Sequence, residues 1–305
     1  MSHIDWGWIK SEPYPLFIDG SFTAASDGGV FEIINPATNK VIALGSDGTI
    51  EDIDRAVMAA RRAFDEGPWP RMPGRERGRY LRRVADLLDA QKEKFAFLEA
   101  ADVGKTVART LDYALPQAID GYEYYAGKAR ELGGEVRQVP EGEWFNYRMW
   151  EPMGVVGEIL PWNGPLMMAC QKVAAILAAG NTAVVKPSEK GSLSNLAFAE
   201  ILAEANFPPG VVNVVAGQDR QLGARLVEHP QVDMVSLTGS TATGKKVMAS
   251  AANTIKKVAL ELGGKNPNIV FEDADVEEAV QWSIYGAFAD QGQICVSGSR
   301  LLLHE

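Results

Sequence analysis

The sequence contains little cysteine and histidine, and this scarcity excludes several kinds of site. Its 305 residues include two cysteines, Cys170 and Cys295, and three histidines. Two cysteines are too few for a disulfide framework and suit a reducing compartment, so we predict a cytoplasmic protein. His3 and His304 are terminal, and His229 precedes a proline. A cysteine–histidine hydrolase and a structural zinc site are therefore disfavoured, and we expect no metal.

The sequence also lacks a basic surplus, a long apolar run and a signal peptide. The net charge is −10, whereas binding to nucleic acid needs a concentrated basic surface. No apolar run is long enough to cross a bilayer, and the first fifteen residues lack the basic-then-apolar order of a signal peptide. The hydrophobic content of 46% and charged content of 23% are ordinary for a globular protein. We expect a soluble protein with neither nucleic-acid nor membrane partners.

The first part of the chain predicts short strands and long surface helices. "PLFIDGSFT" (15–23) alternates around an Asp-Gly turn, which is typical of a hairpin. A helix is predicted from Thr49 to just before Gly67, and a second amphipathic helix over 77–105. The segment 133–153 predicts an extended insert. Its bulky aromatic residues suit either contact with another subunit or domain, or packing on the same chain; they are Trp144, Phe145 and Trp150.

From residue 154 onward, short apolar strands alternate with helices. The strand-like stretches are "VVGEIL", "TAVVKP", "VVNVVAG", "MVSLTGS" and "VALELGG". This alternation predicts an α/β fold with a parallel sheet. Ligands bind such sheets at the carboxyl ends of the strands, so the residues there are the candidates for function.

The first two strands end in polar residues that have ordinary alternative roles. Asn163, in "PWNGP", offers an amide donor, or else caps a helix or makes a turn. Lys186 and Glu189, in "KPSE", are a cation and an anion three residues apart, or else a surface ion pair.

The fourth strand ends in "TGSTATGKK", which nearly matches a phosphate-binding P-loop. Gly239, Gly244 and Lys245 fit the pattern, but Lys246 replaces the hydroxyl that would hold magnesium. A dinucleotide diphosphate at the start of the following helix therefore fits better than a nucleoside triphosphate.

Two reactive side chains follow. Glu261 ends the apolar strand "VALEL" and could act as a base, or else faces water at an edge. Cys295 stands among small residues that leave its thiol accessible, whereas Cys170 lies in an apolar helix and is predicted to be core.

In this order, these stretches resemble the motifs of the NAD(P)-dependent aldehyde dehydrogenase superfamily. The matching motifs are "PWNGP", "VVKPSE", "FPPGVVNVVAG", "LTGSTATG", "LELGGKNP" and "QGQICVSGSR", and the resemblance runs from about Phe17 to the last residue. It implies that Cys295 attacks an aldehyde to form a thiohemiacetal and then a thioester. Asn163 and the Cys295 N–H would hold the oxyanion, Glu261 would activate water, and Lys172 would assist proton transfer.

The resemblance also implies a cofactor site. The residues it assigns there are Trp162, Lys186, Ser188, Glu189, Gly239, Ser240, Thr243, Gly244 and Leu262. Because a carboxylate at the ribose repels a 2′-phosphate, Glu189 predicts NAD over NADP. The aldehyde tunnel would be lined by Gly164, Met168, Gln171, Ile294 and Val296, with a wide and polar mouth.

The implied organisation is a Rossmann-like cofactor domain with an oligomerisation hairpin and the beginning of a second α/β catalytic domain. Its parts are 1–132 (N-terminal part of the cofactor domain), 133–153 (oligomerisation arm), 154–263 (NAD-binding core) and 264–305 (start of the catalytic domain). Family members are usually longer, so we expect the native product to continue beyond Glu305, to form a homodimer or homotetramer, and to be inactive or poorly folded when cut here. The alternatives are an inactive NAD-binding fragment, an interaction module, or an enzyme that passes the acyl group to coenzyme A.

Overall fold

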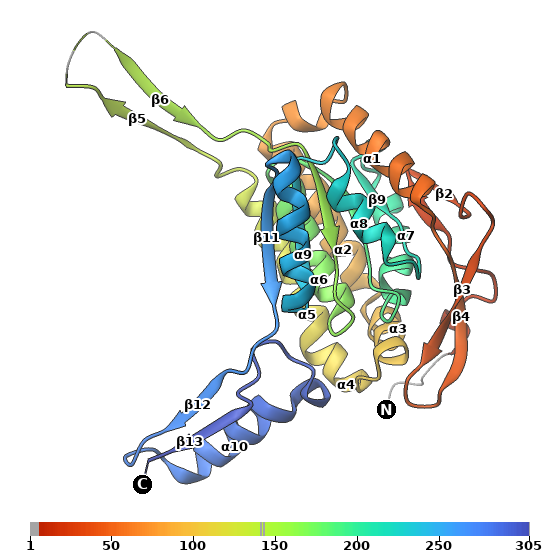
Figure 1. Cartoon of the computed structure of the whole chain (residues 1–305), viewed down its shortest axis with the longest axis vertical. Helices are drawn as coiled ribbons and strands as arrows, with labels where there is room; N and C mark the ends of the chain where they lie inside the picture. The colour runs from red at the N-terminus through yellow and green to blue at the C-terminus, as the bar shows by residue number, and fades with distance from the viewer. Residues whose placement is uncertain (1–5, 141, 143, 305) are drawn as a thin grey trace.

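A computed structural model describes residues 6–140, 142 and 144–304. In these residues the chain forms one seven-stranded sheet, of order β11-β10-β7-β8-β9-β1-β2, and three two-stranded sheets (Figure 1). The strands are β1 (Leu16–Ile18), β2 (Ser21–Thr23), β3 (Val30–Asn35), β4 (Lys40–Ser46), β5 (Gly134–Gln138), β6 (Phe145–Met149), β7 (Val155–Ile159), β8 (Thr182–Lys186), β9 (Val212–Val214), β10 (Met234–Gly239), β11 (Lys257–Leu262), β12 (Pro267–Val270) and β13 (Arg300–Leu303).

Helices surround the large sheet. The α-helices are α1 (Ile50–Asp65), α2 (Gly74–Ala90), α3 (Lys92–Val103), α4 (Val107–Arg109), α5 (Leu115–Lys128), α6 (Pro165–Ala178), α7 (Leu193–Ala205), α8 (Gln221–Glu228), α9 (Thr241–Ala251) and α10 (Val276–Phe288). Short helical turns are η1 (Trp6–Trp8), η2 (Trp69–Arg71), η3 (Thr110–Ala114), η4 (Ala252–Thr254) and η5 (Ala289–Gly292). None of these described helices has the length and apolarity needed to cross a bilayer.

The strands from β11 to β9 in the large sheet all pair in parallel, and β1 adds to β9 in antiparallel orientation. The predicted α/β fold with a Rossmann-like parallel sheet is therefore confirmed. Successive residues of β8 point to opposite faces: Ala183 and Val185 join one core, and Val184 joins the other. Helices α2, α3, α5, α6 and α7 cover the first face, and α1, α8 and α9 cover the second.

The predicted hairpin is present as β1 and β2. Its turn residues Asp19 and Gly20 both have positive φ values, of 54° and 76°. A two-residue turn with this backbone matches the twist of the strands it joins, which is why Asp-Gly marked the hairpin in the sequence.

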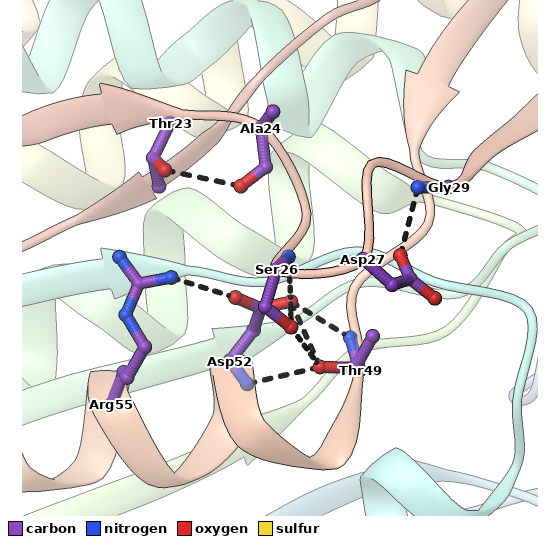
Figure 2. Close-up of polar contacts among 8 residues, drawn as sticks. All are labelled: Thr23, Ala24, Ser26, Asp27, Gly29, Thr49, Asp52 and Arg55. Atoms are coloured by element: carbon purple, nitrogen blue, oxygen red, sulfur yellow. Dashed lines mark hydrogen bonds and ion pairs between the residues drawn. The ribbon is translucent and has the colours of Figure 1, made fainter.

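Helix α1 begins at a capping box, as predicted at Thr49. The Thr49 side chain accepts the Asp52 N–H, and the Asp52 carboxylate accepts the Thr49 N–H at 3.0 Å (Figure 2). The same carboxylate accepts the Ser26 N–H at 3.0 Å and an Arg55 guanidinium hydrogen bond at 3.0 Å. Asp52 is fully buried, so one carboxylate fixes both the helix start and the loop that precedes it.

We expect Asp52→Ala to lower the free energy of unfolding by about 2 kcal/mol, because it removes the cap and leaves buried donors without an acceptor. Urea unfolding followed by circular dichroism measures this change. Asp65→Ala, at the exposed C-terminal end of the same helix, is the matched control and should change the value by less than about 0.5 kcal/mol. Equal losses in the two variants would contradict the assignment.

The prediction of one helix over 77–105 is wrong, because the structure divides the segment into α2 and α3. At Gln91 the backbone leaves helical geometry, with φ −119° and ψ 17°. The Gln91 N–H bonds back to the Leu88 and Asp89 carbonyls, which closes α2 before α3 begins at Lys92. Neither glycine nor proline marks the break, so hydrophobic periodicity could not reveal it.

The segment 133–153 contains the hairpin of β5 and β6, which extends away from the body (Figure 1). Trp144 and Phe145 are both 77% exposed, and Trp150 is 66% exposed. Among the described residues, nothing covers these aromatic side chains, so the alternative that they pack on this part of their own chain is not borne out. In this structure they face solvent.

The last segment, residues 264–304, forms a small unit with α10 beside the parallel pair β12 and β13 (Figure 1). The stretch "RLLLH" near the end of the sequence contains β13, which pairs with β12. Its leucines nevertheless stay half or more exposed, and α10 buries no residue.

Candidate functional site

The predicted site residues come together at the carboxyl ends of the parallel strands. Strand β7 leads into Trp162 and Asn163, and β8 ends at Lys186. In the neighbouring pair, Thr238 lies opposite Glu261 and Gly239 opposite Leu262. Because these strands run in the same direction, their ends share one edge of the sheet.

A cavity of about 1550 Å³ opens at this edge. Every catalytic candidate and every cofactor candidate except Gly244 lines it. These residues are Asn163, Lys172, Glu261, Cys295, Trp162, Lys186, Ser188, Glu189, Gly239, Ser240, Thr243 and Leu262. The tunnel residues implied for the aldehyde also line it: Gly164, Met168, Gln171, Ile294 and Val296. Their placement is thus settled, and their chemical roles remain predictions.

Gly244 lies behind the wall of the cavity. It is buried in α9, and its N–H already donates to the Ser240 carbonyl at 2.9 Å. A side-chain Cβ at this position would come within 2.9 Å of Leu262 Cδ2. The glycine therefore allows α9 to pack closely against β11, and it does not present a donor to a ligand.

The start of α9 supplies donors from its first turn. The Ser240 hydroxyl caps the helix by accepting the Thr243 N–H at 3.1 Å. With the N–H groups of Thr243 and Gly244 engaged, those of Thr241 and Ala242 remain for an anion, since the first turn of a helix lacks intrahelical acceptors.

Lys186 and Glu189 form the ion pair predicted at the end of β8. Lys186 Nζ lies 3.8 Å from Glu189 Oε2, and Glu189 also accepts a hydrogen bond from the Ser188 hydroxyl at 3.5 Å. Burial lowers the pKa of Lys186, against the opposing effect of the Glu189 charge. The pair lies on the cavity wall, so it is not the surface ion pair of the alternative interpretation.

Asn163 and Cys295 both line the cavity, and a hydrogen bond joins Asn163 to the loop before the cysteine. The Asn163 side-chain amide donates to the Gln293 carbonyl at 2.6 Å. Cys295 is exposed, and its carbonyl accepts from Asn266 at 3.0 Å. Cys170 is fully buried in the core, as predicted. No histidine is among the described residues that line the cavity.

Glu261 is on the edge strand β11, where its side chain is exposed at the cavity wall. Lys172 lines the same cavity from α6 and donates to the Ser236 hydroxyl at 3.3 Å. A carboxylate and an ammonium group thus line one cavity, a combination suitable for moving protons.

The sequence did not predict a role for one buried carboxyl group near Lys172. Glu158 of β7 is fully buried and lies opposite Ser236 in register. Burial raises its pKa to about 8, although the nearby Lys172 charge opposes the shift. The only signal in the sequence was a charged residue inside the apolar strand "VVGEIL".

Two further carboxylates, both on α3, hold the helices that carry the site. Glu99 accepts the Leu166 N–H of α6 at 3.1 Å, and Asp102 accepts the Leu193 N–H of α7 at 2.8 Å. Burial raises the pKa of Asp102 to about 7. These contacts fix the helices that directly follow Asn163 and the "KPSE" turn, yet local sequence gave no sign of partners so far away.

Comparison of the sequence with known proteins agrees with the resemblance that the motifs indicated. The model of the aldehyde dehydrogenase family matches residues 22–305. The chain is 46% identical to betaine aldehyde dehydrogenase 1 of Oryza sativa subsp. japonica and 45% identical to aldehyde dehydrogenase family 2 member C4 of Arabidopsis thaliana. In each case the match covers 95% of this chain and 58% of the relative.

Solved structures agree. A Bacillus cereus aldehyde dehydrogenase in complex with NAD+ is 45% identical, with a TM-score of 0.94 over 96% of this chain and 60% of that chain. The chain thus spans less than two thirds of the length of these relatives. By its motifs, its fold and these matches, it belongs to the aldehyde dehydrogenase family.

Proposed function

We propose that this chain carries the cofactor half and the nucleophile of an enzyme that oxidises a small-molecule aldehyde to a carboxylic acid with NAD+. The observation that carries the proposal is one cavity that joins a thiol, an amide donor and a carboxylate to the Lys186–Glu189 pair. Its volume of about 1550 Å³ exceeds the roughly 1,000 Å³ upper range of small-molecule sites, so cofactor and substrate fit together.

In the first step, Cys295 attacks the aldehyde carbon as a thiolate, its proton having passed to solvent. A carbon–sulfur bond forms, the carbonyl π bond breaks, and the oxygen becomes an oxyanion. One N–H of the Asn163 amide is held by Gln293, which leaves the other, with the Cys295 backbone N–H, to stabilise that charge. When the carbon–oxygen double bond forms again, hydride leaves the carbon for the acceptor that NAD+ would supply when bound, and a thioester remains on Cys295.

In the second step, Glu261 takes a proton from water as the water attacks the thioester. The carbon–sulfur bond breaks, the carboxylic acid departs and the thiolate of Cys295 is regenerated. Lys172, in the same cavity, would help to pass the proton onward, and it contacts Ser236 beside buried Glu158. A water-activating base favours this route over transfer to coenzyme A.

The residues present fit a dinucleotide. Lys186 and Glu189 would bind the adenosine ribose, and the N–H groups at the start of α9 would bind the diphosphate. Trp162, Ser188 and Leu262 line the same wall. When bound, NAD+ supplies the hydride acceptor.

Glu189 is expected to set the preference for NAD over NADP. We expect Glu189→Gln to reduce the ratio of kcat/KM for NAD to that for NADP by about tenfold, because it removes the charge that repels a 2′-phosphate. Steady-state assays with each cofactor measure the ratio, and Glu189→Asp, which keeps the charge, is the control. Faster turnover with NADP than with NAD at equal concentration in the unaltered protein would oppose the proposal.

The function itself is tested on protein expressed from its complete reading frame. Reduction of NAD+ is followed by absorbance with aliphatic, aromatic and polar aldehydes, and the acid product is identified by mass spectrometry. Retained binding of NAD without turnover of any aldehyde would favour the non-catalytic alternative. Gly164 and Gln171, a small and a polar residue that both line the cavity, favour an aldehyde with a polar tail.

The exposed β5–β6 hairpin supports assembly into a homodimer or homotetramer. Trp144, Phe145 and Trp150 present apolar surface with no cover from the described chain, as expected of a subunit contact. Both cysteines are free thiols, which supports a reducing, cytoplasmic location.

A further inference from the structure

The segment that carries Cys295 is attached to the body of the molecule by few polar contacts. Helix α10 buries no residue, and Cys295 itself is exposed. Among the described residues, the side-chain hydrogen bonds from the body to residues 264–304 come from Asn163 and Arg109. Asn163 already has a role in the proposed chemistry, whereas Arg109 does not.

Arg109 makes three contacts with one planar guanidinium group. Its Nε donates to Asp290 Oδ1 at 3.0 Å, and its Nη1 donates to the Tyr285 hydroxyl at 3.0 Å. The group lies over the Tyr113 ring, 3.9 Å from the ring centre. The side chains of Arg109 and Asp290 are 23% and 10% exposed, so this ion pair is shielded far more than an ordinary surface pair.

Asp290 lies in an unusual turn directly before the nucleophile loop. Asp290, Gln291 and Gly292 have positive φ values of 49°, 58° and 71°. Left-handed backbone is unfavourable for glutamine and tolerable for aspartate, so the turn needs support from its surroundings. The next residue, Gln293, is the one whose carbonyl accepts the Asn163 amide. The turn therefore decides where Gln293 and, two residues later, Cys295 lie against Asn163.

We propose that Arg109 is a positioning residue, which holds the 290–292 turn through Asp290 and so sets the place of Cys295 relative to Asn163. This inference rests on the proposed function only for its effect on turnover. Its structural part, the ordering of the turn, stands independently. Arg109 also lines the cavity, beside Asp290.

The test uses Arg109→Ala, Asp290→Asn and the double variant in protein from the complete reading frame. Asparagine keeps the size of Asp290 and its tolerance of positive φ, so this change removes only the charge of the pair. Hydrogen exchange followed by mass spectrometry should show residues 289–297 exchanging at least about tenfold faster in each single variant, with α6 and β10 unchanged. Arg82→Ala, which removes an exposed arginine from α2, should leave exchange in 289–297 unchanged.

Turnover gives a second readout. We expect kcat to fall about tenfold in each single variant while KM for NAD stays within about twofold, because the cofactor side of the cavity is untouched. The double variant should be no slower than the slower single variant, since both changes break the same interaction.

Unchanged hydrogen exchange in residues 289–297, or losses of kcat that multiply in the double variant, would overturn the proposal. If Arg109→Ala fails to fold, Asp290→Asn decides alone. An absence of aldehyde oxidation in the unaltered protein would refute the proposed function while the exchange result remained informative.

Discussion

Cys295→Ser is expected to reduce aldehyde oxidation by at least about a thousandfold, equivalent to roughly 4 kcal/mol of lost transition-state stabilisation. A serine hydroxyl is a far weaker nucleophile than a thiolate, and no described histidine lines the cavity to activate it. The substitution replaces one sulfur atom by oxygen at an exposed position, so the protein should still fold.

The measurement is turnover of NAD+ with aldehyde, beside binding of NAD+ by quenching of intrinsic tryptophan fluorescence. Binding should persist, because the Lys186–Glu189 pair and the start of α9 are untouched. Cys170→Ala is the matched control: it removes the other thiol, which is buried in the core, and should keep turnover at the cost of some stability. Turnover retained in Cys295→Ser would remove Cys295 from the role of nucleophile.

Glu261→Gln is expected to slow the steady-state rate by about a hundred- to ten-thousandfold, which is the usual contribution of a general base. Glutamine has nearly the same shape but cannot accept the proton of water. Attack by Cys295 and loss of hydride need no such base, so the first turnover should still produce reduced cofactor. The result is a rapid burst followed by a slow phase, with the acyl group held on Cys295.

Stopped-flow absorbance resolves the burst, and intact-protein mass spectrometry detects the acyl adduct. Glu277→Gln, which changes an exposed carboxylate on α10 outside the cavity, is the control and should behave like the unaltered protein. An unchanged steady-state rate in Glu261→Gln would exclude this residue as the base. If coenzyme A restored full turnover to the variant, the acylating alternative would gain support instead.

Much of the fold could be read from the chain because its signals are local. The Asp-Gly turn of the first hairpin, the Thr49 cap and the apolar strands after residue 154 each depend on neighbours a few residues away. The break between α2 and α3 could not be predicted, because glutamine is common inside helices and neither glycine nor proline stands at this position.

The candidate site divides in the same way. The sequence by itself determined which residues stand at the ends of parallel strands. Because all carboxyl ends of a parallel sheet lie on the same side, Asn163, Lys186 and Glu261 come together there in any order of the strands. Only the tertiary structure decided that Gly244 serves packing, that Glu99 and Asp102 hold two helix starts, and that Arg109 pairs with Asp290. The physical reason is distance along the chain: these contacts join segments that local propensity and periodicity describe separately, and only folding brings them within hydrogen-bonding range.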